Sequence, residues 1–339
     1  MFFKHKKNVQ GFIRLGPLAS DIINRENGVR DDKRLGGYAS DECAIIGAIV
    51  GDIIGSAHEL KGTRIKTTEF ELFPNNATFT DDTVMTMAVM KWLSDIYRIP
   101  SSDDGLVPIM KDIGLRYMEV GYGHSFKQWL RSENPEPYNS LGNGSAMRVT
   151  AAGLFGENLE ECQMIARISA SVSHNHPEGI KGAEAVASAI HLARIFTTKE
   201  CIKSYIEEKY GYDLSRTLDE IRTSYGFDPT CPGSVPEAII CFLEGEDVES
   251  TIRYAISLGG DADTQACIAG AIAGAYYGTV PRLFVEKIEE LLPEEFLSII
   301  STFLCLNNET AKTICYEPDE DATELKRVLG KGWDFSKLI

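Results

Sequence analysis

The sequence predicts a predominantly helical protein with one folded domain. Long apolar runs with helical spacing dominate the chain, and alternation of apolar and polar residues with β-branched side chains is scarce, so no series of strands is indicated. Hydrophobic residues make up 43% of the 339-residue chain and charged residues 25%, which is typical of soluble globular proteins. No stretch has the composition of a linker, so the apolar helices are expected to pack into a single core.

Glycines recur every four residues in two of the apolar runs. The first run, 44–60, has Gly47, Gly51 and Gly55, and the second, 267–278, has Gly270, Gly274 and Gly278. This spacing places the glycines on one face of a helix, although each costs about 1 kcal/mol relative to alanine. We therefore expect the two helices to cross closely near the centre of the molecule. A third segment has a similar four-residue spacing of small residues, in which only the first is glycine: Gly179, Ala183 and Ala187.

Helix starts and loops can be placed between these runs. Thr80 is a candidate N-cap for a helix through 84–97, and Asp263 or Thr264 is expected to begin the second glycine-bearing helix. The stretch 100–141 is rich in Gly, Pro, Ser and Asn, which favours loops near a site.

Two short acidic blocks, 180 residues apart, place carboxylates beside a threonine just before an apolar run. They read TDDT at 80–83 and GGDADT at 259–264. Carboxylates that are buried together need a cation or a proton, and hard oxygen ligands favour Mg²⁺, Mn²⁺ or Ca²⁺ over zinc. Taken singly, each block is also explained by acids at a helix N-terminus, which are favoured by about 0.3–1 kcal/mol. The recurrence of the pattern favours a shared metal site.

Three further positions carry candidate chemistry. The segment 142–145 (GNGS) is either a glycine loop whose N–H groups face a phosphate or an ordinary Asn-Gly turn. His174 and His176 are a zinc fragment, a structural pair or a ligand contact, and neither a Cys nor a third His lies close in sequence. Glu59 follows the first glycine series and either caps a surface or belongs to the site.

The net charge and the length of the apolar runs limit the expected binding partners and cellular location of the protein. The net charge is −16 and the pI about 4.9, which argues against nonspecific nucleic-acid binding. No run reaches the roughly 20 apolar residues that span a bilayer, so no membrane partner is expected. The segment 1–30 lacks the apolar core of a signal peptide, and none of the eight cysteines forms a CxxC pair. A cytoplasmic protein with reduced thiols is therefore expected.

The motifs, taken in order, resemble those of the ADP-ribosylglycohydrolase family, which includes dinitrogenase reductase-activating glycohydrolase and the ADP-ribosylarginine and ADP-ribosylserine hydrolases. The matching segments are GAIVGDIIGSAHE (47–59), FTDDTVMTMAV (79–89), GNGSAMRV (142–149), SHNHPEGIKGA (173–183), SVPEAIICFLEG (234–245) and SLGGDADTQACIAGAIAGAYYG (257–278). The resemblance covers about 42–305. It implies an all-α, compact orthogonal helical bundle, with a basic N-terminal extension at 1–41, the family domain at 42–307 and a C-terminal tail at 308–339.

The resemblance also implies a site. Metal ligands would be Thr80, Asp81, Asp82, Asp261, Asp263 and Thr264, holding two Mg²⁺ ions for which Mn²⁺ could substitute. Glu59, Asp81 and Asp82 would be the catalytic residues, with Glu59 as general base or water-positioning group. The ADP-ribose site would be lined by Gly142, Asn143, Gly144, Ser145, Met147 and His174, with the diphosphate against the glycine loop.

The implied enzyme is a Mg²⁺-dependent hydrolase that cleaves the glycosidic bond at the anomeric carbon of the distal ribose. It would release ADP-ribose from a modified protein side chain or from a small-molecule conjugate. Arginine, serine, another side chain, a nucleobase and an ester remain open as leaving groups, as does the oligomeric state. The alternatives are a catalytically silent ADP-ribose-binding protein and a metal-dependent phosphohydrolase that attacks the diphosphate. The products separate the two hydrolases, since diphosphate attack yields AMP and ribose phosphate.

Overall fold

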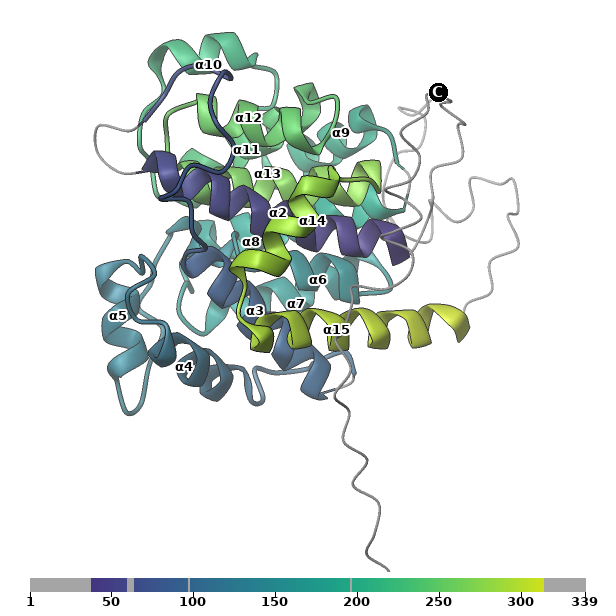
Figure 1. Cartoon of the computed structure of the whole chain (residues 1–339). Helices are drawn as coiled ribbons and strands as arrows, with labels where there is room; N and C mark the ends of the chain where they lie inside the picture. Colours follow the sequence, from purple (N-terminus) through teal and green to yellow (C-terminus); the bar gives the residue numbers. More distant parts are fainter. Residues whose placement is uncertain (1–37, 60–63, 97, 196, 314–339) are drawn as a thin grey trace, which may run out of the picture.

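The protein is a bundle of α-helices without strands in the part of the chain that the computed structural model describes, residues 38–59, 64–96, 98–195 and 197–313 (Figure 1). The one β-bridge in these ranges is isolated and joins Gly142 to Thr230. The helices are α2 (Tyr38–Glu59), α3 (Asp81–Ile96), α4 (Leu106–Arg116), α5 (His124–Arg131), the 3₁₀ turn η1 (Asn143–Ser145), α6 (Thr150–Phe155), α7 (Leu159–Ser171), α8 (Pro177–Arg194), α9 (Lys199–Tyr210), α10 (Leu218–Ser224), α11 (Cys231–Glu244), α12 (Val248–Ser257), α13 (Ala262–Tyr277), α14 (Arg282–Leu291) and α15 (Glu294–Thr313). The predicted all-α fold is confirmed.

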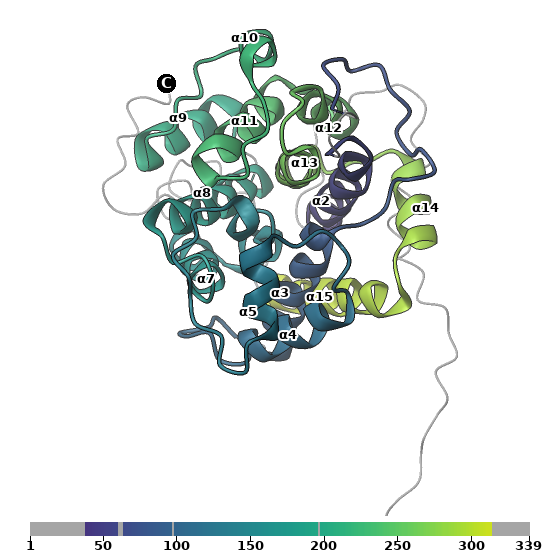
Figure 2. The same ribbon diagram turned by 90° about the vertical axis from the view of Figure 1, so that its left-hand side faces the viewer.

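Helices α2 and α13 lie side by side at the centre, with other helices around them (Figures 1 and 2). The glycines on their facing surfaces leave no room for a side chain. A Cβ atom at Gly51 would lie 2.2 Å from the carbonyl oxygen of Ala266, and one at Gly47 would lie 2.1 Å from that of Gly270. The backbones therefore touch directly, as the four-residue glycine spacing predicts. The last glycine of the second series, Gly278, instead ends α13 in a left-handed conformation.

The close crossing fixes where three helix ends meet. The last two turns of α2 pass the start of α13, because a Cβ atom at Gly55 would lie 2.4 Å from the Cα of Asp263. The start of α3 packs beside them, and α8, α11 and α12 cover the rest of α13. Thr80 precedes α3 and its hydroxyl accepts from the N–H of Asp82 at 3.3 Å, so the predicted N-cap is confirmed. Helix α13 begins at Ala262, slightly earlier than predicted, because Asp261 is its N-cap.

The stretch 100–141 differs from the loops predicted for it, since it contains α4 and α5. Gly105 has φ of 82° and turns the chain into α4, whose buried side chains include Leu106, Met110 and Ile113. That spacing is one apolar face of a helix, and the Gly and Pro residues around it obscured the pattern. The remaining segment, 132–141, is irregular and leads into the glycine loop.

The expected domain limits fall within the first and last helices, α2 and α15, so the division at 42 and 307 stays a prediction. Most of the expected extension (1–41) and of the tail (308–339) lies outside the described residues. Within the described ranges, every helix is too short or too polar to cross a membrane.

Candidate functional site

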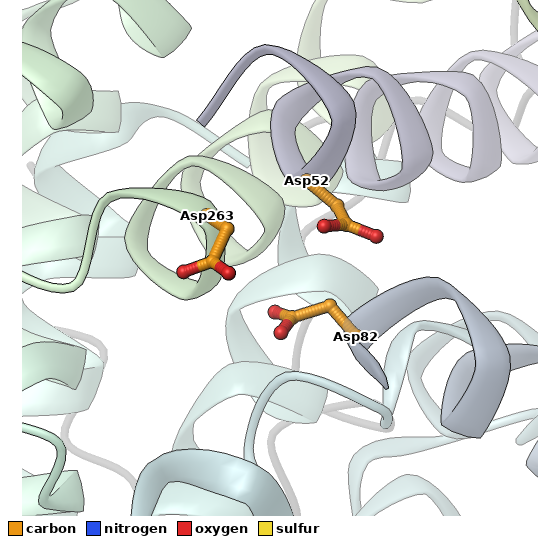
Figure 3. Close-up of side chains that lie close together, drawn as sticks. All are labelled: Asp52, Asp82 and Asp263. Atoms are coloured by element: carbon orange, nitrogen blue, oxygen red, sulfur yellow. The ribbon is translucent and has the colours of Figure 1, made fainter. Parts of the chain in front are cut away.

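Three aspartates from three helices point toward one another at the centre of the molecule (Figure 3). Asp52 comes from α2, Asp82 from α3 and Asp263 from α13, and each offers an oxygen within 4.8 Å of the other two. They are 0%, 2% and 5% exposed. The predicted pair of acidic blocks is therefore brought together in space, and a third acid that was not predicted joins it.

Asp52 organises the turn that starts α3. Its carboxylate accepts four hydrogen bonds, from the backbone N–H and the hydroxyl of Thr80 at 2.9 and 2.7 Å and from those of Thr83 at 3.0 and 2.5 Å. Three of these bonds fall on Oδ2 and one on Oδ1, whereas Oδ1 of Asp82 is buried without a hydrogen-bond partner. Asp52 is thus better suited to position the block 80–83 than to bind an ion, and Asp82 is the stronger candidate ligand.

A second acidic triad shares Asp263 with the first. Glu59, at the end of α2, and Asp261 each offer an oxygen within 4.8 Å of the other and of Asp263. The amide of Asn143 donates to Oδ2 of Asp261 at 2.7 Å, which ties the glycine loop to this triad. Thr264 lies between the triads and donates from its hydroxyl to Oδ2 of Asp82 at 3.1 Å. Two adjacent oxygen-lined positions result.

The remaining predicted acid, Asp81, lines the edge of the cluster. Its backbone N–H donates to the carbonyl oxygen of Val120 at 3.0 Å. Gly121 has φ of 112°, and a Cβ atom there would lie 3.0 Å from Oδ1 of Asp81. Glycine is therefore required at 121 both for its backbone conformation and for the space beside the carboxylate.

Burial raises the pKa of every acid in the cluster. Burial and the charge of Asp52 raise the pKa of Asp81 to about 8. Burial and neighbouring aspartates raise the pKa values of Asp82 and Asp263 well above the ordinary range. Burial, followed by the charge of Asp261, also raises the pKa of Glu59. Among the described residues, none of these acids, nor Asp52 or Asp261, forms a salt bridge.

The cluster forms the floor of a cavity of about 360 Å³, which is within the range of small-molecule sites. The cavity brings together residues that were predicted from distant segments: Glu59, Asp81, Asp82, Gly142, Asn143, Gly144, Met147, His174, Asp261, Asp263 and Thr264. Its walls also contain Phe126, Tyr138, Arg148 and Phe227. Thr80 and Ser145 are buried and are not in the lining.

The glycine loop, 142–145, is supported by hydrogen bonds on the side away from the cavity. Ser145 is fully buried and its hydroxyl donates to the carbonyl oxygen of Gly179 at 2.7 Å, so its side chain supports the loop rather than facing the cavity. His174 faces the loop, because a Cβ atom at Gly144 would lie 3.1 Å from its Nε2. His176 caps α8, and its Nδ1 accepts from the N–H of Glu178 at 3.1 Å. Of the two histidines, only His174 lines the cavity.

Among the residues of this region that were not predicted as site residues, Asp52 and Arg148 are buried and charged. Each has a signal in the sequence. Asp52 is a single acid inside a very apolar run and precedes Glu59 by seven residues, which places both on one face of the helix. Arg148 follows the glycine loop and precedes the buried helix α6. A charged residue inside an apolar segment is rarely buried unless it has a specific partner.

Comparisons with known proteins agree with this arrangement. Residues 42–312 match the ADP-ribosylglycohydrolase family. The chain is 28% identical to the ADP-ribosylhydrolase ARH3 of Mus musculus, over 72% of this chain and 86% of that protein, and 28% identical to ARH3 of Homo sapiens, over 72% and 88%. A solved structure described as an ADP-ribosylglycohydrolase-related protein complex has the same fold. Its TM-score is 0.59 at 24% identity, covering 80% of this chain and 98% of that one. The chain therefore belongs to the ADP-ribosylglycohydrolase family.

Proposed function

We propose that this chain is a Mg²⁺-dependent hydrolase that releases ADP-ribose from a modified protein side chain or a small-molecule conjugate. The observation that carries the proposal is the floor of the cavity. Five carboxylates line that floor and a sixth, Asp52, lies within 4.8 Å of two of them. None of the six forms a salt bridge in the described part of the chain, so they require cations or protons for charge balance. The family assignment and the name of the ARH3 relatives, ADP-ribosylhydrolase, support glycosidic cleavage as the chemistry.

The acids at the cavity floor fit a pair of divalent ions. All the donors are carboxylate or hydroxyl oxygens, which suit Mg²⁺ or Mn²⁺. The two triads share Asp263. Oδ1 of Asp82 is buried without a hydrogen-bond partner, so it is free to bind a metal ion. The residues that would hold the ions are Thr80, Asp81, Asp82, Asp261, Asp263 and Thr264. When bound, such ions orient hydroxyl groups and lower the pKa of water.

Glu59 is the best candidate for the general base. It is partly buried and lies at the cavity with Asp261 and Asp263, where its carboxylate can accept a proton from a water molecule. In the proposed reaction Glu59, as a member of the second triad, would lie beside the anomeric carbon of the distal ribose. Asp81 and Asp82 would also act there, because fixed negative charge stabilises the oxocarbenium character that develops as the glycosidic bond breaks.

The other end of the cavity suits the ADP part of the ligand. In the loop 142–145, the N–H of Gly142 donates to the hydroxyl of Ser140 and that of Asn143 to the carbonyl oxygen of Pro229. The N–H groups of Gly144 and Ser145, in the 3₁₀ turn, are the ones that can face a diphosphate. Asn143 connects this loop to Asp261, so the phosphate site and the acidic cluster are held at a fixed separation. Met147 packs between the two, with its sulfur 3.9 Å from the hydroxyl of Thr264.

The proposal is tested by measuring release of free ADP-ribose from ADP-ribosyl-arginine, -serine and -threonine substrates and O-acetyl-ADP-ribose, with Mg²⁺ and with EDTA. We expect Mg²⁺-dependent release from at least one substrate. Tight Mg²⁺-dependent ADP-ribose binding without release from any of them would indicate a binding protein. AMP and ribose phosphate as products would indicate attack on the diphosphate, and either result would overturn the proposal.

A further inference from the structure

Arg148 is a buried cation without a carboxylate partner. It is 1% exposed and forms no salt bridge with any residue that the structure describes. Its Nη2 donates to the carbonyl oxygen of Ser169 at 2.5 Å and to the hydroxyl of Ser173 at 3.0 Å, and its Nε donates to the hydroxyl of Ser169 at 3.3 Å. A buried guanidinium is costly to maintain, so a role beyond packing is expected of it.

The hydrogen bond from Arg148 to Ser173 determines in which direction the hydroxyl proton of Ser173 points. An arginine only donates, so the Ser173 oxygen accepts from Arg148 and its own proton needs an acceptor elsewhere. Ser173 is fully buried, and the one acceptor within reach of its hydroxyl among the described residues is Nδ1 of His174, at 2.8 Å. Leaving the hydroxyl proton without an acceptor would be unfavourable. Ser173 therefore donates to His174, and Nδ1 of that histidine carries no proton.

The second ring nitrogen of His174 then carries the proton. Nε2 lies against the glycine loop, 3.1 Å from where a Cβ atom of residue 144 would be and 3.6 Å from where one of residue 142 would be. It has no hydrogen-bond partner among the described residues, although His174 is only 5% exposed and lines the cavity. The rings of Tyr138 and Phe126 hold the imidazole at centroid distances of 5.6 and 6.3 Å.

We propose that Arg148 acts through Ser173 as a positioning residue, which fixes His174 as a neutral donor whose Nε2–H points at a phosphate oxygen bound on the glycine loop. The choice of phosphate rests on the proposed function, whereas the relay from Arg148 to His174 does not. Burial and the neighbouring guanidinium lower the pKa of His174 well below its usual value, which keeps the ring neutral. A neutral donor can bind the phosphate without adding a second buried charge beside Arg148.

The relay is tested in the wild-type protein without ligand, by long-range ¹H–¹⁵N NMR of the histidine rings. His174 is assigned by comparing the spectrum with that of His174→Gln. We expect one tautomer at neutral pH, with the proton on Nε2 and a hydrogen-bonded, unprotonated Nδ1. A proton on Nδ1, or a mixture of both tautomers, would overturn the proposal. This measurement requires no enzyme activity, so its failure is distinct from failure of the proposed function.

A pair of serine variants separates positioning from packing. Ser173→Ala removes the donor to Nδ1, whereas Ser169→Ala removes a bond to the same guanidinium without touching His174. We expect Ser173→Ala to shift the Nδ1 resonance and to weaken ADP-ribose binding about 5- to 10-fold, the equivalent of one hydrogen bond. Ser169→Ala should leave both unchanged.

An equal loss of ADP-ribose affinity in the two serine variants would show that Arg148 and its partners contribute only to packing. An unchanged Nδ1 resonance in Ser173→Ala would show that the serine does not donate to the histidine. If the wild-type protein shows the expected tautomer but binds no ADP-ribose, the relay stands and the ligand assignment fails.

Discussion

At the scale of single residues, Asp52 shows how a buried carboxylate can position the neighbouring residues of a site. Its bonds to Thr80 and Thr83 fix the first turn of α3 and thereby the direction of Asp82. The family resemblance pointed to both acidic blocks but not to this residue. The seven-residue spacing between Asp52 and Glu59 indicates only that both lie on one face of a helix. The hydrogen-bond partners of Asp52 could not be identified from the sequence, because Thr80 and Thr83 lie 28 and 31 residues further along the chain.

Replacing Asp52 with asparagine should destabilise the protein and weaken Mg²⁺ binding. Both N–H groups donate to Oδ2, so the amide oxygen of asparagine can replace that atom but without the negative charge. The NH₂ group would then take the place of Oδ1 and face the hydroxyl of Thr80, which donates to Oδ1 in the wild type. We expect a loss of about 3 kcal/mol in the free energy of unfolding, measured by urea denaturation. Asp95→Asn, which breaks an exposed pair with Lys91, is the control and should change it by less than about 0.5 kcal/mol. A similar loss in both variants would contradict the role assigned to Asp52.

Replacing Glu59 with glutamine should separate binding from turnover. The amide keeps the shape of the side chain but cannot accept a proton, so turnover should fall roughly 10²- to 10⁴-fold. The dissociation constant for ADP-ribose, measured by calorimetry, should stay close to that of the wild type. Glu71→Gln, at an exposed position, is the matched control. Full activity in the Glu59 variant would remove this residue from the mechanism.

At the scale of elements, the crossing of α2 and α13 was predictable because glycine spacing reports backbone contact directly. Their relation to α3 was not, since no pattern in the sequence records which helix ends meet. The acidic blocks were predicted to converge from their chemistry, and the structure brings them together at three helix termini. Helices α4 and α5 were missed because glycine and proline mark both loops and helix starts, as Gly105 does here.

An alanine at Gly51 should disturb both the fold and the acidic cluster. Its Cβ atom would lie 2.2 Å from the carbonyl oxygen of Ala266, which belongs to backbone and cannot move aside alone. The helices must separate, and we expect a loss of at least about 2 kcal/mol despite the higher helix propensity of alanine. Gly226→Ala is the control, because no atom lies within 4 Å of a Cβ there. Urea denaturation of both variants checks this, and equal stabilities would argue against direct backbone contact.

At the scale of the whole molecule, the fold brings acids together at an electrostatic cost. The net charge of −16 adds to the repulsion inside the cluster. A core that was selected only for stability would use apolar side chains at these positions. The cluster is best explained by a cation that binds the folded protein and stabilises it by mass action.

The stability of the metal-free protein should therefore fall as pH rises. A carboxyl whose pKa is raised by folding stabilises the fold below its unfolded pKa, and that contribution is lost as pH rises through the folded value, which is about 8 for Asp81. In EDTA, Tm should decrease from pH 6 to pH 9. The increase in Tm on adding Mg²⁺ should be larger at pH 9 than at pH 6, because fewer protons must leave. Calorimetry at both pH values checks this, and a larger Mg²⁺ effect at pH 6 would contradict it.

We propose that the meeting point of α2, α3 and α13 holds two divalent ions. The most direct measurement is the number of Mn²⁺ ions bound per chain, by equilibrium dialysis of the wild type and of Asp263→Asn, which alters the residue shared by both triads. We predict two ions for the wild type, and loss of both or a strong weakening of both in the variant, with the helical circular dichroism spectrum retained. A wild-type protein that binds no Mn²⁺, or a variant that binds two ions as tightly as the wild type, would contradict the account.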